Sequence, residues 1–460
     1  MVTIQFCGGA QSVTGGNYLI DNGNIKFLIE CGLLQGKAEA DEWNYQPFPY
    51  DPAEVKFLIA THAHIDHIGR IPKAVKDGFS GDIYSTYPTK DFSEVSLLDT
   101  VHIMESDNRR LPLFDQADVH QSMKQWKGVE YGDIIEVDQN VSFRFQDAGH
   151  ILGSAVTEVW ILDPETGKRI KLVTSGDLGN TPSVLLRNYD YVKEADYVMV
   201  EAAYGDRIHE QTDIRKDILR QAVRDIIERK GVLIIPTFSI ERTQDILYEL
   251  NDIVENHSGE GKILGRVGKI DVYLDSPLAI KSTEIHEKYP QYYNPEARKL
   301  AKEDDVFDFP FFQMTADRNS SMAINTAPQP KLIMAGSGMS TGGRILYHEQ
   351  KYLSDPNNMI LFVGYQAPHT LGRRILDGES PVRIHGKDVE NKIEVRKVDG
   401  YSAHADQNML LDWVSGFESP KKVFVIQGET DASFALANRI ISDLEYEAIV
   451  PEENQIIHLS

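Results

Sequence analysis

The sequence of 460 residues contains little cysteine, with only Cys7 and Cys31. Two thiols cannot build a disulfide framework or a thiolate zinc knuckle. Neither cysteine lies near the histidine-rich segment of the sequence, so any metal site there has to use other ligands. We therefore expect both cysteines to be reduced core residues of a cytoplasmic protein.

Long apolar runs and an N-terminal targeting pattern are also missing. No stretch approaches the ~20 apolar residues that are needed to span a bilayer. The first residues, MVTIQFCGGAQSVTGG, enter a strand pattern directly, without the basic and apolar regions of a secretory signal. We therefore expect no membrane partner.

Positive charge is scarce. The chain has 47 Lys and Arg against 70 Asp and Glu, which gives a net charge of −23. Non-specific attraction to nucleic acid depends on Lys and Arg, so binding away from an active site is expected to be weak. A nucleic-acid substrate is not excluded, because bound metal ions can make a cleft locally positive.

The length exceeds what one hydrophobic core usually holds, so we expect two domains. Strands dominate the first half, with helical patterns near 89–107 and 115–126. The strands expected there cover 2–6, 17–23, 25–30, 55–60, 141–149, 155–162 and 170–177. The Asn-Gly pair within 21–24 predicts a hairpin turn, because both residues tolerate positive φ.

From about residue 206 the pattern changes to helices that alternate with apolar strands. Such alternation favours a parallel sheet covered by helices. Ser239 is expected to cap a helix over 240–256. The other expected elements are helices over 213–230 and 407–416 and strands over 232–238, 270–277, 331–339, 358–365 and 421–428.

Four potential metal ligands fall within six residues, directly after the apolar strand 55–60: His62, His64, Asp66 and His67. Alternate residues of an extended segment face the same side, so His62 and His64 can approach one ion together. Imidazole nitrogen and carboxylate oxygen suit zinc, manganese or iron. This segment therefore predicts a metal site.

Two more residues lie where such a site would need them. His150 follows a strand in QDAGHILGS, and Asp177 follows another in VTSGDLG. Each lies next to a glycine, so its side chain is expected at a sheet edge with room beside the backbone. Together with the histidine-rich segment, both are interpreted as metal ligands.

These motifs resemble those of the β-CASP ribonucleases, within the metallo-β-lactamase superfamily. The order of the family's motifs is matched by His62, His64, Asp66, His67, His150, Asp177, Glu201 in VEAAYGDR and His404 in GYSAHAD. The segments IPTFSIERTQDILYEL, YLDSPLA, AGSGMSTGGRILYHEQKYL and FVGYQAPHTLGRRIL also resemble the inserted β-CASP domain. The resemblance covers nearly the whole chain.

The resemblance implies an α/β protein: a four-layer αββα metallo-β-lactamase fold with an inserted β-CASP domain, a parallel sheet flanked by helices. The N-terminal part of the metallo-β-lactamase domain would cover residues 1–205 and its C-terminal part residues 365–460. The β-CASP domain would cover residues 206–364.

The resemblance also implies two divalent metal ions, expected to be Zn²⁺. His62, His64 and His150 would hold the first, and Asp66 and His67 the second, with Asp177 bridging both. Such a pair makes hydroxide available near neutral pH.

Asp66, Glu201 and His404 are the expected catalytic residues. Glu201 would hold the ring of His404 and favour its charged form. His404 could then stabilise a phosphate oxygen or protonate the leaving group.

Three positions depart from the family's pattern. Gln427 replaces the motif C histidine, so the second site is expected to bind weakly or to prefer manganese. Glu30 stands where an aspartate is usual, and one more methylene can be accommodated. His369 replaces a usual glycine, and it either supplies the missing imidazole or, as favoured here, lies on a surface loop.

An RNA phosphodiester hydrolase is the favoured function. The alternatives are a weakened pseudonuclease that binds RNA or a partner, and a metallohydrolase that acts on DNA or another ester. The sequence leaves open endonucleolytic or 5′-exonucleolytic cutting, although Ser402 and Gly336–Gly343 are candidates for a terminal-phosphate pocket. It also leaves the oligomeric state open, with a homodimer as one option.

Overall fold

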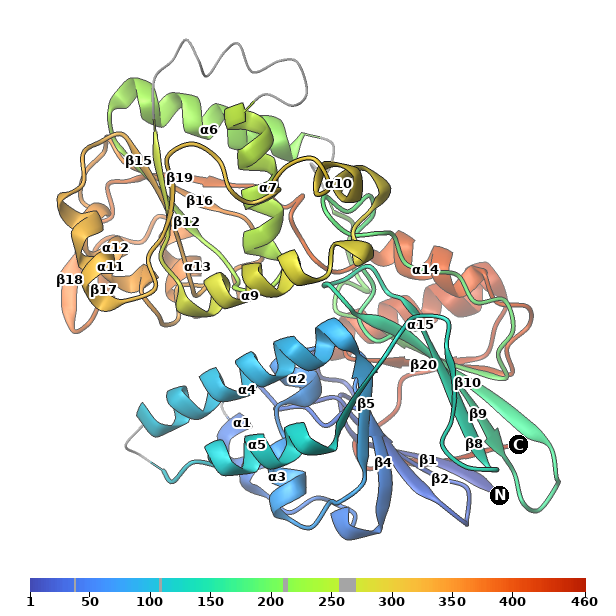
Figure 1. Ribbon diagram of the computed structural model, residues 1–460. Helices are drawn as coiled ribbons and strands as arrows, with labels where there is room; N and C mark the ends of the chain where they lie inside the picture. Colours follow the sequence, from blue (N-terminus) through green and yellow to red (C-terminus); the bar gives the residue numbers. More distant parts are fainter. Residues whose placement is uncertain (37–38, 107–109, 210–213, 256–269) are drawn as a thin grey trace. The chain divides into compact units, whose positions relative to one another are not determined.

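The computed structural model describes residues 1–36, 39–106, 110–209, 214–255 and 270–460 (Figure 1). The chain divides into two compact units. The first unit combines Met1–Ile208 with His404–Ser460, and the second is His209–Ala403. The second unit is thus an insertion in the first.

The C-terminal boundary of the insertion differs from the one expected at 364. Residues up to Ala403 belong to the inserted unit. The reason is a strand, β19 (Glu394–Lys397), that pairs in parallel with β16 (Met359–Phe362) of the inserted sheet. Backbone pairing, which the local sequence pattern does not reveal, assigns these residues to the insertion.

Two sheets form the centre of the first unit, each with seven strands among the described residues. The first has the order β22-β1-β2-β3-β4-β5-β6. Its strands are β1 (Val2–Gly8), β2 (Asn17–Asp21), β3 (Lys26–Ile29), β4 (Val55–Ile59), β5 (Asp82–Thr86), β6 (Trp126–Val129) and β22 (Ile456–Leu459). β2 and β3 form the predicted hairpin, and Gly23 in its turn has a φ of 87°.

The second sheet has the order β21-β20-β11-β10-β9-β8-β7. Its strands are β7 (Ile134–Glu136), β8 (Val141–Asp147), β9 (Ala155–Leu162), β10 (Arg169–Thr174), β11 (Tyr197–Glu201), β20 (Lys422–Ile426) and β21 (Ala448–Ile449). β20 pairs in parallel with β11, so the segment after the insertion completes this sheet.

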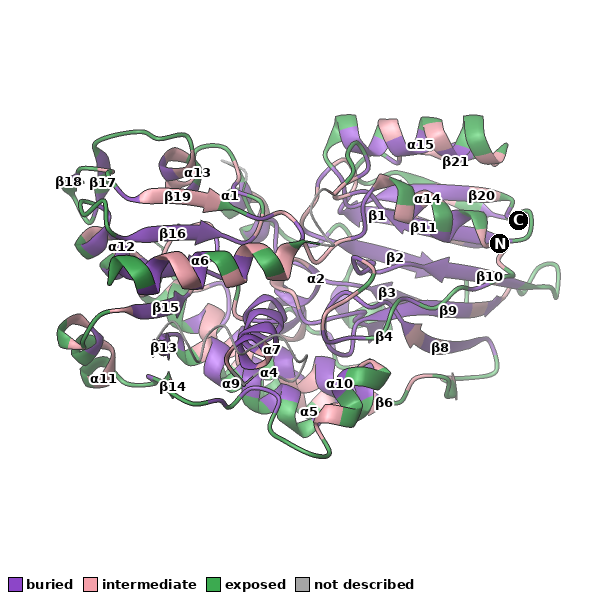
Figure 2. Ribbon diagram, turned by 90° about the horizontal axis from the view of Figure 1, so that it is seen from above, coloured by how far each residue is buried: buried purple, intermediate pink, exposed green. Residues whose placement is uncertain are grey.

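Apolar side chains from the two sheets share one core, which includes Phe6, Phe27, Phe143 and Phe424. Helices lie outside both sheets, which gives the predicted αββα layers (Figures 1 and 2). Those on the first sheet's side are α1 (Ala40–Tyr45), α2 (Ile65–Ile68), α3 (Ile71–Lys76), α4 (Tyr87–Ser106) and α5 (Gln116–Gln125). Those on the second sheet's side are α14 (Gln407–Ser415) and α15 (Thr430–Leu444). The 3₁₀ helix η1 (Pro52–Glu54) precedes β4.

The inserted unit is built on the predicted parallel sheet, with the order β14-β13-β15-β12-β16-β19 over the described residues. Its remaining strands are β12 (Val232–Pro236), β13 (Asp271–Leu274), β14 (Phe312–Met314) and β15 (Lys331–Ala335), and a separate hairpin joins β17 (Val382–Ile384) and β18 (Lys387–Val389). Its helices are α6 (Arg215–Arg229), α7 (Arg242–Glu255), α9 (Pro277–Lys288), α10 (Pro295–Leu300), α11 (Arg318–Ala323), α12 (Ile345–Tyr352) and α13 (Leu371–Leu376), with the 3₁₀ helices η3 (Pro290–Tyr292) and η4 (Ile324–Thr326). One face of the sheet packs against α12 and α13.

The predicted helices at 89–107 and 213–230 correspond to α4 and α6, although residues 107 and 213 lie outside the described residues. The helix predicted over 407–416 corresponds to α14. Within the described part of the chain, none of the helices is both long and apolar enough to cross a bilayer.

The prediction that Ser239 caps a helix over 240–256 is wrong. α7 begins only at Arg242, because the preceding Glu241 has a left-handed φ of 66° that cannot continue a helix. Ser239 Oγ instead lies 3.4 Å from Ser276 Oγ. The predicted end at 256 lies outside the described residues.

Candidate metal centre

The histidine-rich segment begins in an extended stretch after β4 and ends in the single turn α2. His62 and His64 belong to the extended part, and Asp66 and His67 belong to α2. The backbone of Gly32 lies against α2, and a Cβ there would be 1.6 Å from the Asp66 carbonyl oxygen. Only glycine permits this approach, which brings the turn carrying Asp66 and His67 next to the end of β3.

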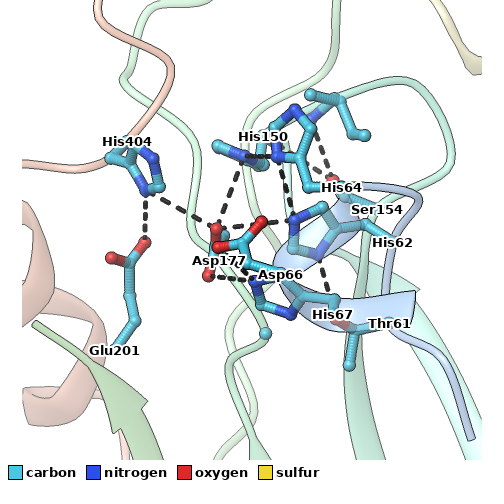
Figure 3. Close-up of polar contacts among 12 residues, drawn as sticks. Thr61, His62, His64, Asp66, His67, His150, Ser154, Asp177, Glu201 and His404 are labelled. Atoms are coloured by element: carbon cyan, nitrogen blue, oxygen red, sulfur yellow. Dashed lines mark hydrogen bonds and ion pairs between the residues drawn. The ribbon is translucent and has the colours of Figure 1, made fainter. Parts of the chain in front are cut away.

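Three imidazole nitrogens and one carboxylate oxygen converge at the first group of ligand atoms (Figure 3). His64 Nδ1 lies 3.2 Å from both His62 Nε2 and His150 Nε2. Asp177 Oδ2 lies 3.4 Å from His62 Nε2 and 3.6 Å from His150 Nε2. A tetrahedral zinc site with ~2.0–2.1 Å bonds has ligand-to-ligand edges of about 3.3–3.4 Å. The four atoms are therefore spaced as such a site requires.

The protonation of these imidazoles also fits a cation. Burial lowers the pKa of His62, His64 and His150, and neighbouring imidazoles lower it further, against the opposing effect of Asp177. Metal ligation requires the neutral form of histidine, with a lone pair on the coordinating nitrogen. The low pKa values favour unprotonated coordinating nitrogens, so a metal ion could bind without first displacing a proton from them.

A second group of atoms lies on the other side of Asp177. His67 Nε2 is 3.4 Å from Asp177 Oδ1 and 3.7 Å from Asp66 Oδ2. Burial lowers the pKa of His67, but Asp177, Asp66 and Glu30 together raise it well above its ordinary value. This position therefore favours positive charge. Asp177 presents one oxygen to each group of ligand atoms, as a carboxylate bridging two ions would.

Gln427 completes the surroundings of His67. It follows β20 with a φ of 46°, and its Nε2 lies 2.8 Å from His67 Nε2. Tyr18 donates its hydroxyl hydrogen to Gln427 Oε1 at 3.3 Å. Gly16 faces the amide, since a Cβ at this glycine would lie 3.4 Å from it. The amide is thus held against the imidazole at the position where the family's pattern has a histidine.

Glu30 supports one imidazole in each group. Its carboxylate accepts hydrogen bonds from the backbone N–H and the hydroxyl of Thr61. Thr61 Oγ1 lies 3.1 Å from His62 Nδ1. Glu30 Oε1 also lies 3.3 Å from His67 Nδ1, although without the alignment of a hydrogen bond. The longer side chain predicted to be accommodated is fully buried here.

Glu201 and His404 lie next to Asp177 as a carboxylate–imidazole pair. His404 Nδ1 is 3.4 Å from Glu201 Oε1 and 3.7 Å from Asp177 Oδ2. The backbone N–H of Leu178 donates to Glu201 Oε1 at 2.8 Å. Burial lowers the pKa of His404, but Glu201 and Asp177 outweigh it and raise that pKa to about 9. The two carboxylates therefore favour the charged form of His404.

The eight predicted site residues lie together in the first unit, although they come from segments far apart in the sequence (Figure 3). His369 is exposed and belongs to the inserted unit. Ser402 and Gly336–Gly343 belong to the same unit. The sequence did not reveal Tyr18 or Thr61. Thr61 directly precedes His62, which was a usable signal, whereas Tyr18 lies in an apolar strand and gave none.

Three families match successive parts of the chain. Residues 19–174 match the family described as the metallo-beta-lactamase superfamily domain. Residues 243–375 match the Beta-Casp domain, and residues 388–451 match the Zn-dependent metallo-hydrolase RNA specificity domain. The matched ranges follow one another in the order that the motifs predicted.

Curated relatives align over nearly the whole chain. Ribonuclease TTHA0252 of Thermus thermophilus is 35% identical over 93% of this chain and 94% of its own length. Transcription termination factor FttA of Methanosarcina mazei is 29% identical over 97% of this chain and 70% of its own length. The RNase J-like protein of Methanocaldococcus jannaschii is 28% identical, over 99% of this chain and its full length.

A solved structure shares the fold. The crystal structure of a protein of unknown function from Enterococcus faecalis V583 aligns with a TM-score of 0.56 over 99% of each chain, at 11% identity. At this identity only the architecture carries over. Family matches and relatives together confirm the resemblance that the motifs predicted: the chain belongs to the β-CASP family of the metallo-β-lactamase superfamily.

Proposed function

We propose that this protein hydrolyses phosphodiester bonds of RNA at the cluster centred on Asp177. The observation that carries the proposal is the position of this carboxylate. One of its oxygens faces three imidazoles, the other faces His67, and the pair Glu201–His404 lies beside it. Two relatives, Ribonuclease TTHA0252 and the RNase J-like protein, support RNA as the substrate.

The residues would hold two divalent ions. His62, His64, His150 and Asp177 would bind the first, and Asp66, His67 and Asp177 the second. When bound there, the ions would neutralise charge on the phosphodiester and make water nucleophilic near neutral pH. Imidazole nitrogens favour zinc at the first position.

Gln427 weakens the second position. Its Nε2 faces the same His67 nitrogen that would point toward the second ion. Gln427 therefore supplies at best an amide oxygen in place of an imidazole, and its amide lies close to the nitrogen that would ligate the ion. Binding there is weaker than at the first position, or selects manganese.

His404 supplies the proton that the leaving oxygen needs. Its Nδ1 lies 3.4 Å from Glu201 Oε1, so the carboxylate holds the ring beside Asp177, where the substrate would bind. Glu201 keeps the ring oriented and charged, since its own carboxylate is fixed by the N–H of Leu178. A positioned acid of this kind contributes roughly 10²–10⁴ to the rate.

The test compares cleavage of one RNA strand and the DNA strand of the same sequence, by the purified protein before and after chelation. We expect RNA cleavage that chelation abolishes and that added zinc or manganese restores. Equal cleavage of the DNA strand would favour the alternative of a metallohydrolase that also acts on DNA. Binding of RNA without cleavage at any metal concentration would favour a pseudonuclease, although all predicted ligands except the motif C histidine are present. The homodimer and the cytoplasmic location remain predictions.

A further inference from the structure

The carboxyl edge of the inserted sheet carries two exposed aromatic rings. β12 lies between β15 and β16, and the three strands run in parallel. Phe238 follows β12 and is 43% exposed, and Tyr365 follows β16 and is 40% exposed. Ligands of parallel α/β sheets bind outside the carboxyl ends of the strands. The two rings are thus displayed where such sheets usually bind.

The ring of Phe238 rests against glycine backbone. A Cβ at Gly338 would lie 2.7 Å from two atoms of the ring, and one at Gly364 would lie 4.0 Å from it. Any larger residue at position 338 would push the ring away. The phenyl group is therefore backed by main chain on one side and open to solvent elsewhere, rather than folded into the core.

The loops behind the ring are held rigidly. Gln366 is only 1% exposed, and its Nε2 donates to the carbonyl oxygens of Gly338 at 2.9 Å and Gly364 at 3.2 Å. Thr243 donates its hydroxyl hydrogen to the carbonyl oxygen of Phe238 at 2.7 Å. The buried amide thus ties the loop after β15 to the loop after β16, and the ring lies on the joined surface. A preorganised ring loses little entropy when a ligand covers it.

The net charge of −23 bears on what this surface binds. A protein poor in Lys and Arg gains little from phosphate neutralisation, so a nucleic-acid ligand must be held partly through its bases. Every base has a π-face, and stacking on an aromatic side chain tolerates any sequence. A base in a duplex is already stacked and is not available to such a ring.

We propose that the Phe238 ring is a stacking surface for an unpaired base of the RNA, with Tyr365 as a second exposed ring on the same edge of the sheet. This inference rests on the proposed ribonuclease function and adds a binding subsite within the inserted unit. It gives the enzyme a preference for single strands that is independent of sequence. The preference comes from the insertion rather than from the metal-ligating residues.

The test measures the Kd of the metal-loaded protein for a phosphorothioate single-stranded RNA that resists cleavage. Phe238→Ala is expected to weaken binding roughly 5- to 150-fold, the range for loss of one base–aromatic stack. Phe238→Tyr, which keeps a ring, restores affinity. Tyr347→Ala is the matched control, since Tyr347 is a 62% exposed ring of helix α12 in the same unit that packs against His385. Thermal unfolding verifies that each variant is folded.

A set of strands, each with one abasic position, identifies the base that contacts Phe238. One abasic position is expected to weaken binding to the parent protein but not to Phe238→Ala, because the two changes remove the same interaction. The stacking subsite is overturned if Phe238→Ala binds the intact strand as tightly as the parent does. It is also overturned if every abasic position weakens binding to Phe238→Ala as much as it weakens binding to the parent. If the parent binds no RNA yet hydrolyses bis(p-nitrophenyl) phosphate, the ribonuclease function itself fails.

Discussion

Two buried aspartates, one in each unit, have opposite surroundings. Asp275 follows β13 and accepts four hydrogen bonds of 2.7–2.8 Å, from Thr315, Ser321, Arg344 and His348. The four histidines around Asp177 stand 3.4–3.7 Å away: His62, His67, His150 and His404. Both carboxylates are buried and both have imidazole neighbours.

The difference distinguishes a structural cluster from a binding site. Every lone pair of Asp275 is used by a donor at hydrogen-bonding distance, so there is no place for a cation between the groups. The 3.4–3.6 Å spacing between Asp177 and the rings of His62, His67 and His150 is close to the distance between ligands that share an ion.

The largest effect is expected for His64→Ala. This change removes the nitrogen that contacts both His62 and His150, so the first ion loses the centre of its donor set. RNA hydrolysis should fall to background, with zinc content by elemental analysis reduced and the folded structure retained by circular dichroism. Full activity of the metal-stripped His64→Ala protein would contradict the proposal that hydrolysis at the Asp177 cluster depends on bound metal.

His404→Ala tests whether His404 acts as a proton donor rather than as a metal ligand. It should lower kcat by roughly 10²–10⁴ while the metal content stays that of the parent. The reason is that His404 Nδ1 lies nearer to Glu201 Oε1, at 3.4 Å, than to Asp177 Oδ2, at 3.7 Å, and is proposed as an acid rather than a ligand. Parallel loss of metal and activity would instead make His404 a ligand.

Asp275→Asn tests the other half of the comparison. We expect about 3–5 kcal/mol lower stability to urea, because the change leaves the buried His348 and the partly buried Arg344 without their carboxylate partner, with no change in bound metal. Although burial raises the pKa of Asp275, its hydrogen bonds, His348 foremost, lower it to about 2, below the ordinary 3.8.

The pH dependence of that stability loss follows from the depressed pKa. A carboxylate with a lower pKa in the folded state stabilises the protein above about pH 4 and loses this contribution as the pH falls toward 2. The difference between parent and Asp275→Asn, measured by urea unfolding from pH 7 to pH 3, should therefore narrow below pH 4. A constant difference would show that the charge of Asp275 is not responsible.

The smallest effect is expected for Gln427→His. An imidazole in place of the amide would add a ligand to the second position, and we expect the metal concentration for half-maximal activity to fall roughly tenfold. The parent should retain closer to one tightly bound zinc than two after dialysis. If the parent already retains two and the substitution changes neither affinity nor rate, another group fills that position.

The cluster of candidate metal ligands could be predicted because its residues signal locally. His62 and His64 alternate after an apolar strand, and His150 and Asp177 each follow a strand beside glycine. The resemblance then added Glu201 and His404, which have no comparable local pattern. The resemblance likewise implied the αββα layers, whereas the hairpin followed from the Asn-Gly pair within 21–24.

Features that depend on distant pairing could not be predicted. The insertion extends to Ala403 because β19 pairs with β16, and no local pattern marks that pairing. The apolar run 232–238 suggests one buried strand, but β12 ends at Pro236 and leaves Phe238 exposed. Which oxygen of Asp177 faces which imidazole likewise depends on the packing of four separate segments.

The position of His404 after the insertion sets an order of events during synthesis. All predicted metal ligands precede residue 178, whereas His404 and the strand β20 emerge from the ribosome only after the entire insertion. A nascent chain that ends at Ala403 contains the predicted ligands but has neither the proposed acid His404 nor the strand that extends the sheet beside β11. The ribosome, itself made of RNA, therefore carries an incomplete nuclease until β20 has been made.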